Sequence, residues 1–222
     1  MRTRAHGHSS TGRKARTGST RPAVRPLTPE LWPALEDLFG RAGASNGCWC
    51  MYWRIGGAYR DRGNEKNRAA FRSVVRNGPP PGLLALEGDR AVGWCQVTPR
   101  TALPYLDRSM RPGPAETGSV WSVSCFFVRR GERGRGVGAQ LLAAAIRHAR
   151  DAGATTLEAY PVKVTAPGSR RDWYTGYVST FERLGFRKVA DRRPDQPVMQ
   201  RELGRSRASA SRRSTAKRRP RA

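Results

Sequence analysis

The chain has 222 residues with 42 Lys and Arg against 17 Asp and Glu, a formal net charge of +25, and a hydrophobic fraction of only 37%. This length has room for one ordinary domain with tails. No stretch approaches 18 consecutive apolar residues and no apolar region follows the N-terminus, which argues against a membrane span or a secretory signal, so we expect a cytoplasmic protein.

The two ends of the chain are strongly basic. Residues 1–25 hold seven Lys or Arg and residues 204–222 hold eight, without any acidic residue, and this leaves about +10 for residues 26–203. We therefore predict a disordered basic N-terminal tail over 1–21, one domain over 22–203 and a disordered basic C-terminal tail over 204–222. The tails either act as solubilising ends or make nonspecific contact with nucleic acid or another polyanion.

The N-terminal part of the domain predicts one strand and two helices. The strand covers 22–26, and a helix begins at Thr28 as N-cap, with Pro29 at its first position, and ends at Gly40. A tryptophan-rich loop covers 47–54, and a second helix covers 64–76.

The loop carries Cys48 and Cys50, which with Cys95 and Cys125 are all the cysteines of the chain. No second Cys or His pair stands at zinc-ligand spacing, so we expect reduced, mostly buried thiols and no metal.

The second half of the domain alternates strands and helices. A proline-rich connector precedes a β-hairpin with strands over 83–87 and 91–97, and a long polar loop follows over 98–117. Two further strands are predicted over 119–128 and 155–160, and two helices over 137–152 and 173–184. The domain ends in two strands, over 186–190 and 198–202. This interleaving predicts a mixed α/β domain around a single core.

The turn over 133–138 is the feature that points to function. Its sequence, Arg-Gly-Arg-Gly-Val-Gly, follows the strand residues Phe126-Phe127-Val128 and opens the apolar helix. A helix N-terminus offers unpaired N–H groups and the positive end of a dipole, and glycine allows an anion to approach the backbone closely, so we expect a phosphate site. The spacing matches neither the dinucleotide fingerprint nor a P-loop.

With a second motif downstream, Phe181-Glu182-Arg183-Leu184-Gly185-Phe186, this turn resembles the GCN5-related N-acetyltransferase (GNAT) superfamily. The resemblance implies a central mixed β-sheet, splayed open between two parallel strands and flanked by helices, with acetyl-CoA in the gap. By the family pattern, Phe127 and Val128 pair with the pantetheine arm. The pyrophosphate is then held by the turn residues Arg133, Gly134, Arg135, Gly136, Val137 and Gly138.

One position departs from the family pattern. Many relatives have a tyrosine, which protonates the departing CoA thiolate, where this chain has Phe181. Tyr177 lies four residues earlier and Tyr174 three before that, and on a continuous helix either hydroxyl replaces it; otherwise the thiolate leaves unaided. Glu158 is the only acidic residue on the strand beside the site, and it is either the general base or the partner of an arginine.

The acceptor is left open by the sequence. Trp49, Tyr52, Trp53, Trp94, Trp121 and Tyr160 are candidates for an aromatic-walled pocket, although about half of them are expected to be core residues. We predict transfer of acetyl directly to a primary amine of a small molecule or a protein. The alternative is a catalytically weak module of the same fold that associates with nucleic acid through its basic tails. A homodimer is compatible with either.

Overall fold

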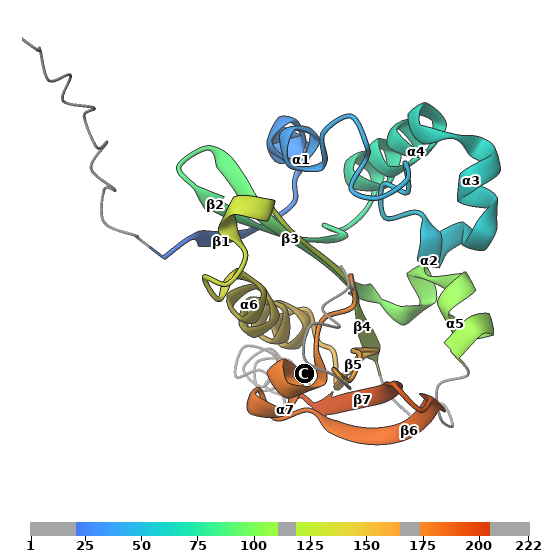
Figure 1. Cartoon of the computed structure of the whole chain (residues 1–222), viewed down its shortest axis with the longest axis vertical. Coiled ribbons are helices and arrows are strands. Elements are labelled where there is room, and N and C mark those ends of the chain that lie inside the picture. The colour runs from blue at the N-terminus through green and yellow to red at the C-terminus, as the bar shows by residue number, and fades with distance from the viewer. Residues whose placement is uncertain (1–20, 111–118, 165–173, 205–222) are drawn as a thin grey trace, which may run out of the picture.

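The computed structural model describes residues 21–110, 119–164 and 174–204. The predicted basic tails lie outside this range, apart from residues 21 and 204. Within it, seven strands form one sheet in the order β1-β2-β3-β4-β5-β7-β6 (Figure 1). The strands are β1 (Ala23–Pro26), β2 (Gly82–Glu87), β3 (Arg90–Pro99), β4 (Val120–Val128), β5 (Thr156–Ala159), β6 (Arg187–Arg193) and β7 (Gln196–Glu202).

Helices cover both faces of this sheet (Figure 1). On one face lie α1 (Trp32–Phe39), α2 (Tyr52–Ile55), α3 (Tyr59–Arg62), α4 (Asn64–Asn77) and α5 (Pro104–Met110), and on the other lie α6 (Val137–Asp151) and α7 (Val178–Arg183). Short 3-10 turns occupy η1 (Pro29–Leu31), η2 (Gly56–Ala58), η3 (Arg100–Ala102) and η4 (Arg130–Glu132). The predicted fold class, a mixed α/β fold with a central sheet flanked by helices, is confirmed.

The sheet opens between β4 and β5, its only parallel pair among the described strands. These strands pair from Val120 with Thr156 to Val123 with Ala159, where β5 ends while β4 continues to Val128. The residue pairing of β4 with β3 also shifts at this point, because Gln96 lies opposite Cys125 and Val97 opposite Val123, which leaves Ser124 as a bulge. The two strands therefore diverge where the sequence predicts the site.

Three predicted elements differ from the structure. The helix predicted over 173–184 begins only at Val178, because Gly176 has φ +81° and Tyr177 is extended at φ −112°, ψ 137°. The expectation that Tyr177 and Tyr174 precede Phe181 on one helical face is therefore wrong. The loop predicted over 98–117 contains η3 and α5, and the loop predicted over 47–54 contains the start of α2. Pro104 at the first position of α5 is the start signal that the sequence analysis missed.

The packing of α6 on the sheet fixes the start of that helix. Gly93 of β3 allows the contact, since a Cβ there would lie 2.7 Å from Val137 Cγ1 and 3.0 Å from Leu141 Cδ1. Both of those side chains belong to the buried cluster between α6 and the sheet. The first residue of α6 is therefore held against the middle of β3 by direct packing.

Candidate active site

A groove of about 760 Å³ runs along the free end of β4, over the start of α6, to α7. All but one of the residues predicted to hold the cofactor line it: Phe127, Val128, Arg133, Gly134, Gly136, Val137 and Gly138. These come from a strand end, a turn and a helix start that are consecutive in the chain. The exception is Arg135, which is turned away.

The glycine-rich turn leaves its backbone accessible. Gly134 has φ +81° and Gly136 has φ +76°, and a Cβ added at either position or at Gly138 would meet nothing within 4 Å. Gly136 is the N-cap of α6 and supplies no side chain to the first N–H groups of the helix. A turn with left-handed residues that leads into a helix N-terminus forms a concavity of N–H groups for an anion. The turn therefore fits a phosphate group.

The arginines of this region divide between the groove and nearby carboxylates. Arg135 is paired with Glu132, and its Nη2 lies 2.9 Å from Glu87 Oε1. Arg90 also donates to Glu132 at 3.0 Å, and this hydrogen bond, more than any other interaction, holds the pKa of Glu132 below its ordinary value. Arg133 lines the groove and donates from Nε to the Val128 carbonyl at 3.2 Å. Arg135 therefore secures the turn to β2, whereas Arg133 contributes charge to the groove.

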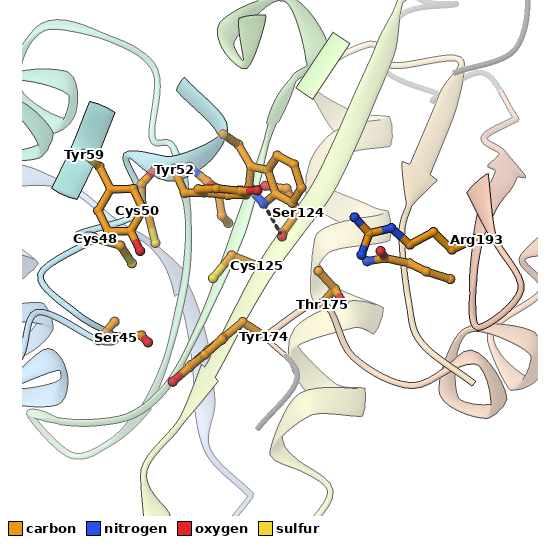
Figure 2. Close-up of a pocket in the computed structure, with 14 residues that line it drawn as sticks. Ser45, Cys48, Cys50, Tyr52, Tyr59, Ser124, Cys125, Tyr174, Thr175 and Arg193 are labelled. Carbon is orange, nitrogen blue, oxygen red and sulfur yellow. Dashed lines mark hydrogen bonds between the residues drawn. The ribbon is translucent and has the colours of Figure 1, made fainter. Parts of the chain in front are cut away.

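A second pocket of about 320 Å³ adjoins the groove (Figure 2). Consecutive residues line the two cavities in two places: Cys125 and Thr175 line the pocket, whereas Phe126 and Gly176 line the groove. Tyr174 lines both. The two cavities therefore meet where β4 leaves β5.

The floor of this pocket is a network of neutral groups. Ser124 donates from Oγ to Gln96 Oε1 at 2.9 Å, and its carbonyl accepts a hydrogen bond from Trp53 Nε1 at 2.9 Å (Figure 2). Burial raises the pKa of Cys48 to about 11, and it also raises the pKa of Cys50 well above its ordinary value. Both thiols are therefore protonated at neutral pH.

Glu158, the predicted general base, lies outside both cavities. It is fully buried on β5, where the Tyr160 hydroxyl donates to one carboxylate oxygen and Gln200 Nε2 donates to the other at 2.8 Å. Arg100 Nη1 lies 3.6 Å from the latter oxygen. The sequence left two roles open for Glu158, a general base or the partner of an arginine, and the structure contains the arginine partner. Tyr160 lies between the Glu158 carboxylate and Trp53.

The tyrosines near α7 differ in what they line. Tyr177, the predicted acid, lines the groove, as does Phe181, and Tyr174 lines both cavities. The Tyr174 ring stacks parallel to Phe127 at 6.5 Å between centroids, and its carbonyl accepts the Phe126 N–H at 2.5 Å. Both tyrosines therefore line a cavity, although the predicted helix does not extend to either of them.

The six aromatic residues predicted for the acceptor pocket have different places. Tyr52 and Trp53 line it, whereas Trp49, Trp94 and Trp121 belong to the buried clusters and Tyr160 lies behind Trp53. Lining residues that the sequence analysis missed include Tyr59, Thr175, Arg193 and Gln196. No local motif marks them, because they come from distant segments.

Two observations concern the described part of the chain alone. Across residues 21–110, 119–164 and 174–204, no group of three or more His, Cys, Asp or Glu side chains is arranged to hold a metal ion. Within the same ranges, no helix has the length and apolar character that a membrane crossing requires.

The structure thus combines an open mixed sheet, split beside a helix N-terminus, with two adjoining cavities at the split. A profile of the family described as the acetyltransferase (GNAT) family matches residues 36–186. The chain therefore belongs to the acetyltransferase (GNAT) family, and it is an N-acetyltransferase.

Solved structures agree on the fold. A polyamine N-acetyltransferase from Drosophila melanogaster matches with a TM-score of 0.53 at 14% identity, over 82% of this chain and 99% of that one. A structure from Corynebacterium glutamicum, described as histone acetyltransferase HPA2 and related acetyltransferase, matches with a TM-score of 0.51 at 20% identity, over 85% and 99% of the two chains. A comparison with curated proteins gave no significant match.

Proposed function

We propose that the protein transfers an acetyl group from acetyl-CoA directly to a primary amine of a small molecule. The observation that carries this proposal is the pair of adjoining cavities that share Tyr174. The groove is the donor site and the smaller pocket is the acceptor site. The acetyl thioester supplies the group that is transferred.

The donor assignment rests on the glycine-rich turn. Gly134 and Gly136 leave the N-terminus of α6 accessible to the pyrophosphate, and Arg133 adds positive charge in the same groove. Backbone N–H groups alternate in direction along β4, so the N–H of Val128 points away from β3, as the N–H of Phe126 does. An extended pantetheine arm on that side can accept a hydrogen bond from the Val128 N–H. The predicted cofactor residues other than Arg135 are thus proposed to contact the donor directly.

The acceptor must arrive as a neutral amine. An ammonium has no lone pair, and no carboxylate lines the described part of the acceptor pocket to take its proton. Glu158 lies behind Tyr160, so we assign it a positioning role: it holds Tyr160 and Arg100 under the pocket wall. We expect kcat/KM to rise tenfold per pH unit up to the pKa of the acceptor amine. If kcat/KM instead levels off at a pH below the pKa of the acceptor amine, and this plateau is lost in Glu158→Gln, the general-base hypothesis for Glu158 would be restored.

Transfer forms a C–N bond to the amine and breaks the C–S bond, so the thiolate needs a proton. We assign this proton to Tyr174, because it lines both cavities whereas Tyr177 lines only the groove. A general acid contributes typically 100- to 10,000-fold to rate. Tyr174→Phe should therefore lower kcat by at least 100-fold at unchanged acetyl-CoA affinity, with Tyr177→Phe as the matched control. A larger loss in Tyr177→Phe would favour the residue predicted from sequence.

Titration calorimetry with acetyl-CoA, followed by a mass-shift screen of amines, tests the proposal. We expect saturable binding of one acetyl-CoA per chain and a 42 Da shift in at least one small amine (an acetyl group replacing hydrogen). A protein that binds nucleic acid but no acetyl-CoA would favour the alternative function, a nucleic-acid-binding module.

A further inference from the structure

The acceptor pocket is lined by one cationic side chain and by no carboxylate among the described residues. Its described lining consists of aromatic rings, thiols, hydroxyls and amides, and Arg193 is the only Lys, Arg, Asp or Glu among them. Glu158 does not line the pocket: it is fully buried behind Tyr160 and already accepts hydrogen bonds there. A pocket of this kind attracts an anionic group and disfavours a second cationic group.

Arg193 lies at the end of β6 and points into the pocket. Figure 2 shows its guanidinium extending toward Ser124 and Thr175. Within the described residues it has no acidic partner, whereas Arg100 pairs with Asp107 at 2.8 Å. Arg193 is itself exposed, and a guanidinium binds a carboxylate through two parallel hydrogen bonds.

A second polar group at the same end of the pocket lacks a partner. The Thr175 hydroxyl oxygen is buried and forms no hydrogen bond within the described part of the chain. A buried hydroxyl without a partner is costly, so a ligand that accepts its hydrogen bond is bound more tightly. Thr175 directly follows Tyr174, which places this hydroxyl beside the junction with the donor groove.

The opposite end of the pocket is apolar and aromatic. Tyr52 packs edge-to-face on Trp53 at 4.6 Å and on Tyr59 at 5.9 Å between ring centroids, and Cys48 and Cys50 lie beside them. Cys125 lies between the two ends (Figure 2). The volume of about 320 Å³ is at the small end of the range for ligand pockets, so it suits one small molecule rather than a folded segment.

We propose that the acceptor is a free amino acid, whose carboxylate binds Arg193 and Thr175 and whose apolar or aromatic side chain lies against Tyr52, Trp53 and Tyr59. This inference rests on the proposed function and specifies its substrate. In an α-amino acid the amine is one carbon away from the carboxylate. Binding the carboxylate beside Thr175 therefore places the amine next to Tyr174, where the two cavities meet.

The test compares acceptors that differ only in the carboxylate. Leucine, phenylalanine and tryptophan are assayed for CoA release beside their decarboxylated amines, their amides and spermidine, at equal concentrations of neutral amine. A charge-assisted hydrogen bond contributes about 1.5–3 kcal/mol, so we expect kcat/KM for the preferred amino acid to exceed that for its decarboxylated amine by roughly 10- to 150-fold.

The variants locate the carboxylate site. Arg193→Gln should reduce the preference for the amino acid over its decarboxylated amine to about one, and Thr175→Val should reduce it partly while Thr175→Ser restores it. Arg187→Gln is the matched control, because Arg187 is an exposed arginine on the same strand that lines neither cavity and should leave the preference unchanged. Binding of acetyl-CoA, measured by calorimetry, should be the same in all four variants.

The failures are distinguishable. Preferred acetylation of spermidine or of the decarboxylated amines would overturn the inference, as would an enzyme that binds acetyl-CoA but acetylates none of the amino acids. A preference for amino acids that persists in Arg193→Gln would also overturn it. Absence of acetyl-CoA binding would instead refute the proposed function.

Discussion

A carboxylate at position 136 tests the donor groove directly. Gly136 lines the groove as the N-cap of α6, and a side chain there would meet no protein atom within 4 Å of its Cβ. Gly136→Glu therefore places a negative charge in the space proposed for the pyrophosphate. Gly153→Glu is the matched control, because Gly153 follows the other end of α6, has φ +87° and is equally open.

Both substitutions lower the stability of the fold, but only Gly136→Glu is expected to weaken acetyl-CoA binding. A side chain in the left-handed conformation costs roughly 1–2 kcal/mol of stability at either position. Only the carboxylate at position 136 repels a bound phosphate, by roughly 1–3 kcal/mol at the effective dielectric constant of a protein surface. This corresponds to a roughly 5- to 150-fold increase in Kd, and since Gly136 is exposed we expect the lower half of that range.

Calorimetric titration with acetyl-CoA measures the difference, with Gly136→Gln separating size from charge. Thermal unfolding serves as the folding control, and Gly136→Glu should be no less stable than Gly153→Glu, because a carboxylate is favourable at a helix N-terminus and unfavourable at its C-terminus. Equal Kd values for Gly136→Glu and Gly153→Glu would mean that the turn holds no phosphate.

Three further predictions concern the framework of the site. Gly93→Ala should lower the free energy of unfolding in urea by about 1–3 kcal/mol, because its methyl group would lie 2.7 Å from Val137 Cγ1 in a packed core; unchanged stability would mean that α6 can shift freely. Cys48 has a pKa of about 11 rather than 9.0, so it should react with iodoacetamide at pH 8 roughly 100-fold more slowly than an unperturbed thiol. Peptide mass spectrometry follows the labelling, and reaction at the ordinary rate would mean that the Cys48 thiol is exposed to solvent. The lowered pKa of Glu132 gives stability that is present above its ordinary value of 4.5 and lost as pH falls through the lower folded value. Urea unfolding from pH 7 to pH 3 should therefore show a steeper acid loss for the native chain than for Glu132→Gln, and parallel curves would contradict the pairing with Arg90.

The donor groove could be predicted because its parts are adjacent in the chain. The strand end at Phe127, the turn and the first residues of α6 occupy one short segment, so local glycine and apolar patterns determine their geometry. Arg135 was assigned to the phosphate from sequence because local pattern does not reveal its partner Glu87, which lies 48 residues earlier on β2. The helix boundary before Phe181 was misplaced because Gly176 was not recognised as the residue that interrupts it.

The acceptor pocket could not be predicted because tertiary pairing assembles it. Ser45, Gln96, Cys125, Thr175 and Arg193 line one cavity, yet they come from five separate segments and none belongs to a motif. Of the six aromatic residues that suggested a pocket, the three tryptophans Trp49, Trp94 and Trp121 pack in the core instead, since large apolar side chains are needed there as well. Local sequence thus located the groove proposed for the donor, whereas the pocket proposed for the acceptor depends on the fold.

The bulge at Ser124 connects these two halves. It directs the Ser124 carbonyl to Trp53 in the acceptor pocket, and two residues later the N–H of Phe126 meets the carbonyl of Tyr174. Without the extra residue, every later side chain of β4 would change face, because strand side chains alternate. Cys125 would then leave the acceptor pocket and Phe126 would leave the contact with Phe181. A single inserted residue therefore sets both which side chains face the acceptor and where the donor groove begins.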